Sequence, residues 1–162
     1  MYEKVLVPLD GSELAECILP HLESIAKGCG VKSIVFLRAV EPVHLPVGTI
    51  SDGGEVFTEQ DAARVRNQAD QANKESAKNY LDQVASRTKY DGVTNYTEIV
   101  IGKAADSIAE YAARNEVDLI IIATHGRSGI SRWALGSVAD RVLSSACVPV
   151  LMVRAPGCVP GI

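Results

Sequence analysis

The sequence has no hydrophobic run approaching the ~20 residues that a transmembrane helix needs, and no basic segment followed by an apolar stretch of signal-peptide length at its amino terminus. We therefore expect a cytoplasmic protein without a membrane partner. It also has no excess of positive charge, because the formal net charge is −4 and the sequence pI is about 5.4. Proteins that bind nucleic acid or anionic membranes present a broad basic surface. We accordingly expect no nucleic-acid partner either.

Several common binding motifs are missing as well. The cysteines are widely separated and form no Cys-x-x-Cys pair, which argues against structural zinc and predicts reduced, mostly buried thiols at Cys17, Cys29, Cys147 and Cys158. The sequence contains neither a Gly-x-x-x-x-Gly-Lys-[Ser/Thr] loop nor a Gly-x-Gly-x-x-Gly turn after its first apolar run. A nucleotide would therefore be bound neither as in P-loop proteins nor as in the common dinucleotide-binding domains.

What the chain does contain is an alternation of apolar runs and amphipathic stretches. Its 162 residues suit one domain, residues 1–155, followed by a short tail at 156–162. Five apolar runs rich in β-branched residues predict strands at 5–7, 34–37, 97–101, 119–122 and 148–153. Helical patterns between them predict four helices, at 13–27, 59–88, 103–115 and 137–145. The strict alternation predicts an α/β fold with a doubly wound parallel sheet.

The ends of the first helix and one interruption of the alternation are marked by particular residues. Ser12 is a good amino-terminal cap for the first helix, and we expect Gly28 and Gly30 to end it. The segment 41–58 is rich in proline and glycine and is interpreted as a loop insertion. It is equally compatible with a lid over a ligand and with a disordered surface loop.

In a doubly wound sheet, ligands bind beyond the carboxyl ends of the strands, where the winding direction reverses. The residues at the ends of the first two strands are therefore candidate binding residues: Pro8, Leu9 and Asp10, then Ala39 and Val40. The Asp10 carboxylate suits the two hydroxyls of a ribose, although an aspartate at this place also suits capping of the next helix.

The segment after the fourth strand is the strongest candidate for a phosphate site. Gly126, Gly129 and Gly136 let the backbone approach a ligand closely, and Arg127 is a cation suited to phosphate. Ser137 stands where the last helix begins, so the free N–H groups of that helix would face a phosphate. The alternative is a flexible glycine loop in which Ser137 is only a helix cap.

The spacing Ala123-x2-Gly126-x9-Gly136-Ser137 resembles the Gly-x2-Gly-x9-Gly-[Ser/Thr] ATP-binding motif of the universal stress protein family. The runs 4–12, 102–108 and 147–153 resemble the family's first strand, its third strand-to-helix turn and its last strand. Together the similar segments lie within residues 2–154. Ala123 stands where the motif has its first glycine, and we expect this small residue to line the site in the same way.

The resemblance implies a Rossmann-like five-stranded sheet of order 3-2-1-4-5. It implies an adenine beside Ala39 and Val40, a ribose held by Asp10, and phosphates held by Gly126, Gly129, Gly136, Ser137 and Val138. The cofactor would be ATP or another adenine nucleotide, with Mg²⁺ bound through the phosphates, near Asp10 and Ser137, and no metal site made by the protein alone. A homodimer would form through the last strand, between Val148 and Val153, because an unpaired apolar edge strand invites pairing.

Three functions remain open at this point. The first is an ATP-binding regulatory protein of a stress response, in which nucleotide occupancy sets conformation or partner choice. The second is a slow ATPase or phosphotransferase, and the third is a nucleotide-free interaction module. We assign no catalytic residue, because His125 has no nucleophile or carboxylate beside it in the sequence and is interpreted as a loop or phosphate contact. The sequence names no protein partner.

Overall fold

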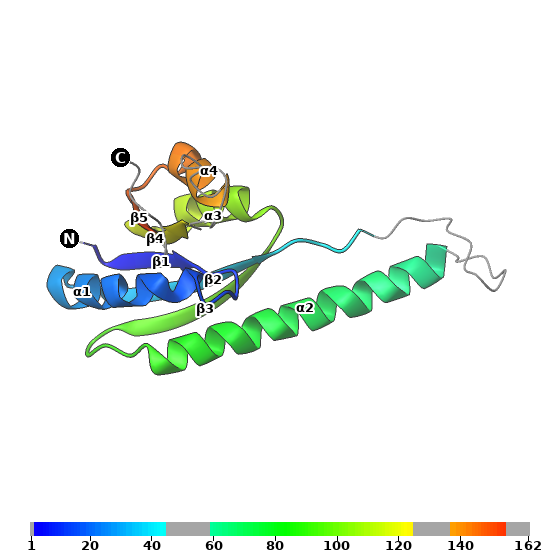
Figure 1. Cartoon of the computed structure of the whole chain (residues 1–162), viewed down its shortest axis with the longest axis horizontal. Coiled ribbons are helices and arrows are strands. Elements are labelled where there is room, and N and C mark those ends of the chain that lie inside the picture. The colour runs from blue at the N-terminus through cyan, green and yellow to red at the C-terminus, as the bar shows by residue number, and fades with distance from the viewer. Residues whose placement is uncertain (1, 45–58, 125–136, 155–162) are drawn as a thin grey trace.

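Five parallel strands form one sheet in the order β3-β2-β1-β4-β5 (Figure 1). The computed structural model describes residues 2–44, 59–124 and 137–154. Within these ranges the strands are β1 (Lys4–Pro8), β2 (Ser33–Val40), β3 (Thr94–Ile101), β4 (Leu119–Thr124) and β5 (Val150–Arg154). The predicted α/β class and the sheet order are confirmed.

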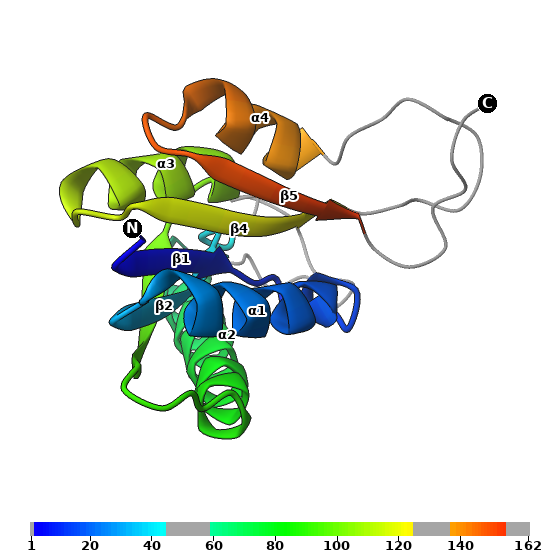
Figure 2. The same cartoon turned by 90° about the vertical axis from the view of Figure 1, so that its left-hand side faces the viewer.

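Helices cover both faces of the sheet, two on each side (Figure 2). The helices α1 (Leu19–Cys29) and α2 (Glu59–Arg87) pack on one face, and α3 (Ala104–Arg114) and α4 (Ser137–Ser145) pack on the other. Because strand side chains alternate between faces, Phe36 joins the first core and Leu37 joins the second. The apolar runs are therefore buried on both sides, as their lack of alternation predicts.

The winding of the sheet reverses at β1. This strand pairs with β2 on one side and with β4 on the other, and the connecting helices change faces between these two pairs. At the amino ends of β1 and β4, Asp118 Oδ2 accepts hydrogen bonds from the backbone N–H groups of Glu3 and Lys4, both at 2.8 Å. The pairing of β1 with β4 ends at Leu6 and Ile120, so beyond them these strands are unpaired with each other toward their carboxyl ends, which is where a doubly wound sheet binds ligands.

The first helix differs from the prediction. A 3-10 helix, Ala15–Ile18, precedes α1, so the segment 13–27 is not one continuous α-helix. Pro20 is the physical reason, because it has no N–H to donate to the carbonyl four residues earlier and is tolerated only in the first turn of an α-helix. Gly30 ends α1 with a left-handed φ of 70°, as expected, whereas Gly28 lies inside the helix and does not end it.

Several strand boundaries and the cysteines also differ from the predictions. The second strand runs to Val40, three residues past its apolar run. The last strand begins at Val150 rather than Val148, and Pro149 precedes it with its carbonyl accepting the Ile120 N–H at 3.0 Å. The third strand begins three residues earlier than its apolar run, at Thr94. The thiols of Cys17 and Cys29 are half-buried and that of Cys147 is exposed, so the expectation of mostly buried cysteines is wrong for these residues.

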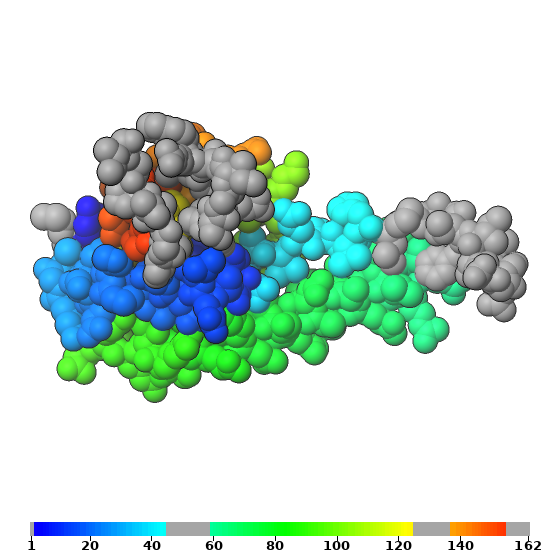
Figure 3. Space-filling model, viewed as in Figure 1, coloured from blue at the N-terminus to red at the C-terminus, as the bar shows by residue number. Residues whose placement is uncertain are grey.

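The helix α2 is much longer than the strands of the sheet. Its 29 residues span about 44 Å, against about 26 Å for the eight residues of β2. The carboxyl half buries Ala77, Leu81 and Val84 against the sheet, and the amino half extends past it (Figures 1 and 3). The Val43 N–H donates to Asp70 Oδ1 at 3.0 Å, which ties the chain leaving β2 to this amino half.

No helix in the described ranges has the length and apolar character to cross a membrane. Residues 45–58, which form most of the predicted insertion, and the predicted tail at 156–162 lie outside the described residues.

Candidate functional site

The carboxyl ends of β1, β2 and β4 lie along one edge of the sheet, since all three strands run parallel. Several predicted site residues lie at or directly beyond this edge: Pro8, Leu9, Asp10, Ala39, Val40 and Ala123. Leu9 is buried, and its N–H donates to the Leu37 carbonyl at 2.9 Å, which fixes the backbone just before Asp10. Four predicted phosphate-site residues lie outside the described residues, as does His125: Gly126, Arg127, Gly129 and Gly136.

Asp10 begins a tight turn at the end of β1. Its Oδ1 accepts hydrogen bonds from the Ser12 N–H at 2.9 Å and from the Ser12 hydroxyl at 2.7 Å. Ser12 Oγ in turn accepts the Ala15 N–H at 3.2 Å, so the start of the 3-10 helix is bound to the same turn. Asp10 therefore makes the local contacts of a capping residue, yet it is exposed at the strand edge. A carboxylate offers about four acceptor positions, so turn formation and ligand binding are compatible roles.

Arg38 of β2 lies directly over this turn. A Cβ on Gly11 would come within 2.9 Å of the Arg38 Nη1 atom, and Gly11 has a φ of +90°, which favours glycine. The Arg38 guanidinium also lies over the ring of Tyr80 from α2, with 5.7 Å between Cζ and the ring centroid. The absence of a side chain at Gly11 is thus what admits the guanidinium between the turn and α2.

Tyr80 is held by charged neighbours. Its hydroxyl donates to Glu16 Oε1 at 3.1 Å, and Arg87 pairs with Glu16 Oε2 at 2.5 Å. Burial raises the pKa of the Tyr80 hydroxyl, and the carboxylates of Glu16 and Asp10 raise it further. Tyr80 therefore remains protonated across the physiological range and keeps donating its hydrogen to Glu16.

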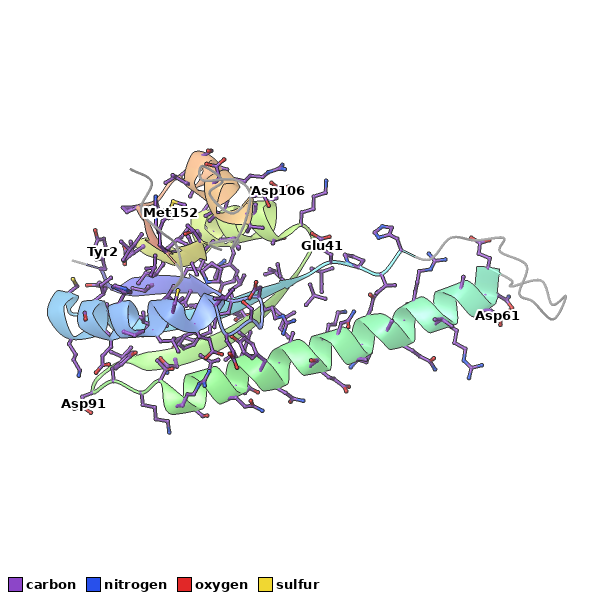
Figure 4. All side chains as sticks on the ribbon, in the orientation of Figure 1. Tyr2, Glu41, Asp61, Asp91, Asp106 and Met152 are labelled. Atoms are coloured by element: carbon purple, nitrogen blue, oxygen red, sulfur yellow. The ribbon has the colours of Figure 1, made fainter. Side chains whose placement is uncertain are left out.

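A pocket of 280 Å³ opens at the end of β2, where the strand meets α2. Six residues line it: Arg38, Ala39, Val40 and Glu41 from the strand end, and Asn73 and Ser76 from the helix. Figure 4 marks Glu41 where the chain leaves the sheet and runs alongside α2. The pocket is near the lower end of the ~300–1,000 Å³ typical of ligand pockets, which suits part of a ligand such as a base. It adjoins the residues beside which the adenine is predicted.

The end of β4 and the start of α4 flank the remaining part of the predicted site. Ala123 is 7% exposed and packs in the core on the α1 side, so its methyl group is accommodated inside the protein. The Thr124 hydroxyl donates to the Val153 carbonyl at 3.5 Å. Ser137 is the first residue of α4, as predicted, and both Ser137 and Val138 are exposed. The amino-terminal turn of α4 is therefore accessible to an anion.

Sequence reasoning missed the contribution of α2. Asn73, Ser76 and Tyr80 recur at intervals of three and four residues, which is the spacing of one helix face. This spacing could have identified a common stripe, but the polar composition of α2 suggests a solvated flank. Only the packing of α2 across β2 shows that the stripe meets Arg38.

The universal stress protein family model matches residues 1–154 of the chain. This chain belongs to the universal stress protein family. Universal stress protein MJ0531 of Methanocaldococcus jannaschii is 32% identical over 96% of this chain and 84% of its own length. The solved structure of protein MJ0577, from the same organism, is 26% identical, covers 97% of this chain and 99% of its own, and superposes with a TM-score of 0.75.

Two more distant members of the family have been solved with adenine nucleotides. A universal stress protein in complex with cAMP is 22% identical, with 95% of this chain and 98% of its own covered and a TM-score of 0.65. The universal stress protein of Archaeoglobus fulgidus in complex with dAMP is 21% identical, with 93% and 97% covered and a TM-score of 0.56. At these sequence identities, the two structures show that they share the fold of this universal stress protein.

The described part of this universal stress protein contains no group of three His, Cys, Asp or Glu side chains placed to hold a metal ion. The predicted place of Mg²⁺, beside nucleotide phosphates near Asp10 and Ser137, stays a prediction.

Proposed function

We propose that this universal stress protein binds an adenine nucleotide, ATP with Mg²⁺ in the first place, at the carboxyl edge of its sheet. The observation that carries the proposal is the pocket between β2 and α2, which opens beside Ala39 and Val40. Asp10, on the neighbouring strand end, supplies an exposed carboxylate for the ribose. A base in the pocket and a ribose at Asp10 would direct the phosphates toward the exposed start of α4.

Family members with cAMP or dAMP support this proposal, since both ligands contain adenine and one phosphate. Residues Gly126, Arg127, Gly129 and Gly136 are proposed to complete the phosphate site, on the sequence motif alone. Pro8 and Leu9 are proposed to shape its floor.

We propose that nucleotide binding has a regulatory role, and the position of the pocket supports this. The pocket has one wall on the sheet and the other on α2, whose amino half extends past the sheet. A nucleotide between these walls would change how α2 is held and hence what this helix presents to a partner. Slow hydrolysis is the alternative, and phosphate release that disappears in the Asp10→Ala variant would favour it. A nucleotide-free interaction module is the second alternative.

Filling the pocket should weaken nucleotide binding. The Ser76→Trp variant places an indole at an exposed, pocket-lining position of α2, and we expect its affinity for ATP to fall by about tenfold or more, because the indole occupies the space proposed for the base. Isothermal titration calorimetry with ATP and Mg²⁺ measures the change. Ser86→Trp is the matched control, since Ser86 is exposed on the same helix ten residues away.

Wild-type protein that binds no ATP at millimolar concentration would refute the proposal and favour the nucleotide-free module. Adenine nucleotide released from the purified protein on denaturation would favour binding over that module. Equal ATP affinities of the Ser76→Trp and Ser86→Trp variants would contradict the placement of the base in this pocket.

We also propose that the protein is a homodimer through β5. In the described sheet β5 pairs with β4 on one side only, and Leu151 on it is 37% exposed. We expect Leu151→Lys to weaken dimerisation by about tenfold, measured by sedimentation velocity across protein concentrations, because a charge replaces an apolar contact in the interface. Ile101→Lys on β3 is the control, since Ile101 is 50% exposed on the strand at the opposite edge of the sheet. A wild-type monomer at all concentrations would contradict the proposal.

A further inference from the structure

We propose that Arg38 is a positioning residue for nucleotide binding, whose guanidinium, lying over the Tyr80 ring, holds the turn that presents Asp10 to the ribose. The inference rests on the proposed function and adds a determinant that lies outside the glycine motif. Arg38 stands at the carboxyl end of β2 and lines the pocket, while Tyr80 belongs to α2. The two residues therefore connect both walls of the pocket to the ribose-binding turn.

The first contact that carries the inference is that of the guanidinium with Gly11. A Cβ on Gly11 would lie 2.9 Å from Nη1, 3.1 Å from Cζ and 3.2 Å from Nη2 of Arg38, so the whole guanidinium covers the centre of the turn. Within the turn, Ser12 donates two hydrogen bonds to Asp10 Oδ1. The turn is thus held by its own hydrogen bonds and by contact with the Arg38 guanidinium, and the direction of the Asp10 carboxylate depends on both.

The second contact joins the turn to α2. Tyr80 supports the guanidinium with its ring and donates its hydroxyl hydrogen to Glu16 at 3.1 Å. Glu16 lies in the 3-10 helix that follows the turn, and Arg87 of α2 holds its other carboxylate oxygen. These contacts form a closed ring from β2 through the turn and the 3-10 helix to α2 and back. Removing the guanidinium opens this ring at the point nearest to Asp10.

Planarity distinguishes a positioning role from simple attraction of phosphate. A guanidinium can lie flat on an aromatic ring and cover a glycine at the same time, whereas a lysine ammonium is a compact point charge. If Arg38 acted on the phosphates by charge alone, the Arg38→Lys variant would keep the wild-type affinity for ATP. If Arg38 acts by holding the turn, the Arg38→Lys variant would lose affinity.

The binding test compares ATP with 2′-deoxy-ATP by calorimetry. We expect wild-type protein to bind ATP about tenfold more tightly, because 2′-deoxy-ATP lacks one hydroxyl that bonds to the Asp10 carboxylate. In Arg38→Gln and Arg38→Lys we expect this ratio to fall below about threefold, chiefly through weaker ATP binding. Lys78→Gln is the matched control, since it removes one positive charge from α2 at a residue paired with Asp82. It should keep the wild-type ratio.

Equal weakening of ATP and 2′-deoxy-ATP in Arg38→Gln, with wild-type behaviour of Arg38→Lys, would overturn the inference and assign Arg38 to the phosphates. Wild-type protein that binds both nucleotides equally would also overturn it, while leaving adenine-nucleotide binding intact. Wild-type protein that binds neither would refute the proposed function itself.

A measurement without nucleotide tests the ring of contacts on its own. Amide hydrogen exchange of the Ser12 N–H, followed by NMR, should be faster by about fivefold or more in Arg38→Gln and Tyr80→Leu than in wild type, because the turn opens more often. Tyr80→Phe keeps the ring beneath the guanidinium and should change the exchange less. Unchanged exchange in Arg38→Gln, in a variant whose thermal unfolding shows that it is folded, would overturn the inference.

Discussion

Replacing Asp10 with alanine is expected to lower the affinity for ATP by about 10- to 100-fold, the loss produced when hydroxyl groups of a ligand no longer bond to a charged carboxylate. Asp10 is exposed just beyond the end of β1, the strand that pairs with the pocket-lining strand β2. The alanine variant also loses both hydrogen bonds from Ser12, so its turn is less ordered. Calorimetric titration with ATP and Mg²⁺ measures the affinity.

The Asp10→Asn variant separates these two causes. An asparagine oxygen still accepts the hydrogen bonds of Ser12, so the turn is retained while the negative charge is lost. We expect Asp10→Asn to lose most of the affinity that Asp10→Ala loses. Glu13→Gln is the control, because it removes one exposed carboxylate charge three residues along the chain. Equal ATP affinities of Asp10→Asn and Glu13→Gln would contradict a ribose-binding role for Asp10.

The sequence predicts the sheet well where burial is complete. The runs that became β1, β2 and β4 are nearly all apolar, since helices cover both of their faces, and their core residues are almost fully buried. The edge strand β3 is weaker in the sequence because all its residues are half-buried or exposed, so its apolar run does not include its first three residues. Pro20 was a local signal that the helical periodicity concealed.

The residues of the candidate site could likewise be predicted only in part from the sequence. Asp10, Ala39 and Val40 could be predicted, because in a parallel sheet the residues at strand ends meet at one edge whatever the packing of the helices. Arg38, Tyr80 and Ser76 could not, since their meeting depends on how α2 crosses β2, about 40 residues apart in the chain. A polar helix gives no apolar stripe from which that crossing can be read.

The second large effect concerns stability, and it is expected at Phe36. This side chain is fully buried on β2, between the paired strands β1 and β3 and in the core that α1 and α2 cover. We expect Phe36→Ala to lower the free energy of unfolding by about 3–5 kcal/mol, through lost burial and the cavity that remains. Urea unfolding followed by circular dichroism measures the change. Since small domains are stable by only about 5–15 kcal/mol, the variant should be close to unfolding at 37 °C.

Tyr96→Ala is the control for this stability effect, because Tyr96 is 51% exposed on the neighbouring strand and should cost less than about 1 kcal/mol. Equal unfolding costs of Phe36→Ala and Tyr96→Ala would contradict the buried placement of Phe36.

Nucleotide binding and stability can be measured in the same unfolding experiment, because a ligand that binds only the native protein stabilises it. ATP at about 100 times its dissociation constant stabilises a native protein that binds it by about 2.7 kcal/mol. We expect this gain in wild type and in Tyr96→Ala, but only about 0.4–1.4 kcal/mol in Asp10→Ala at the same ATP concentration, because its weaker affinity leaves ATP at about 1 to 10 times the dissociation constant of that variant.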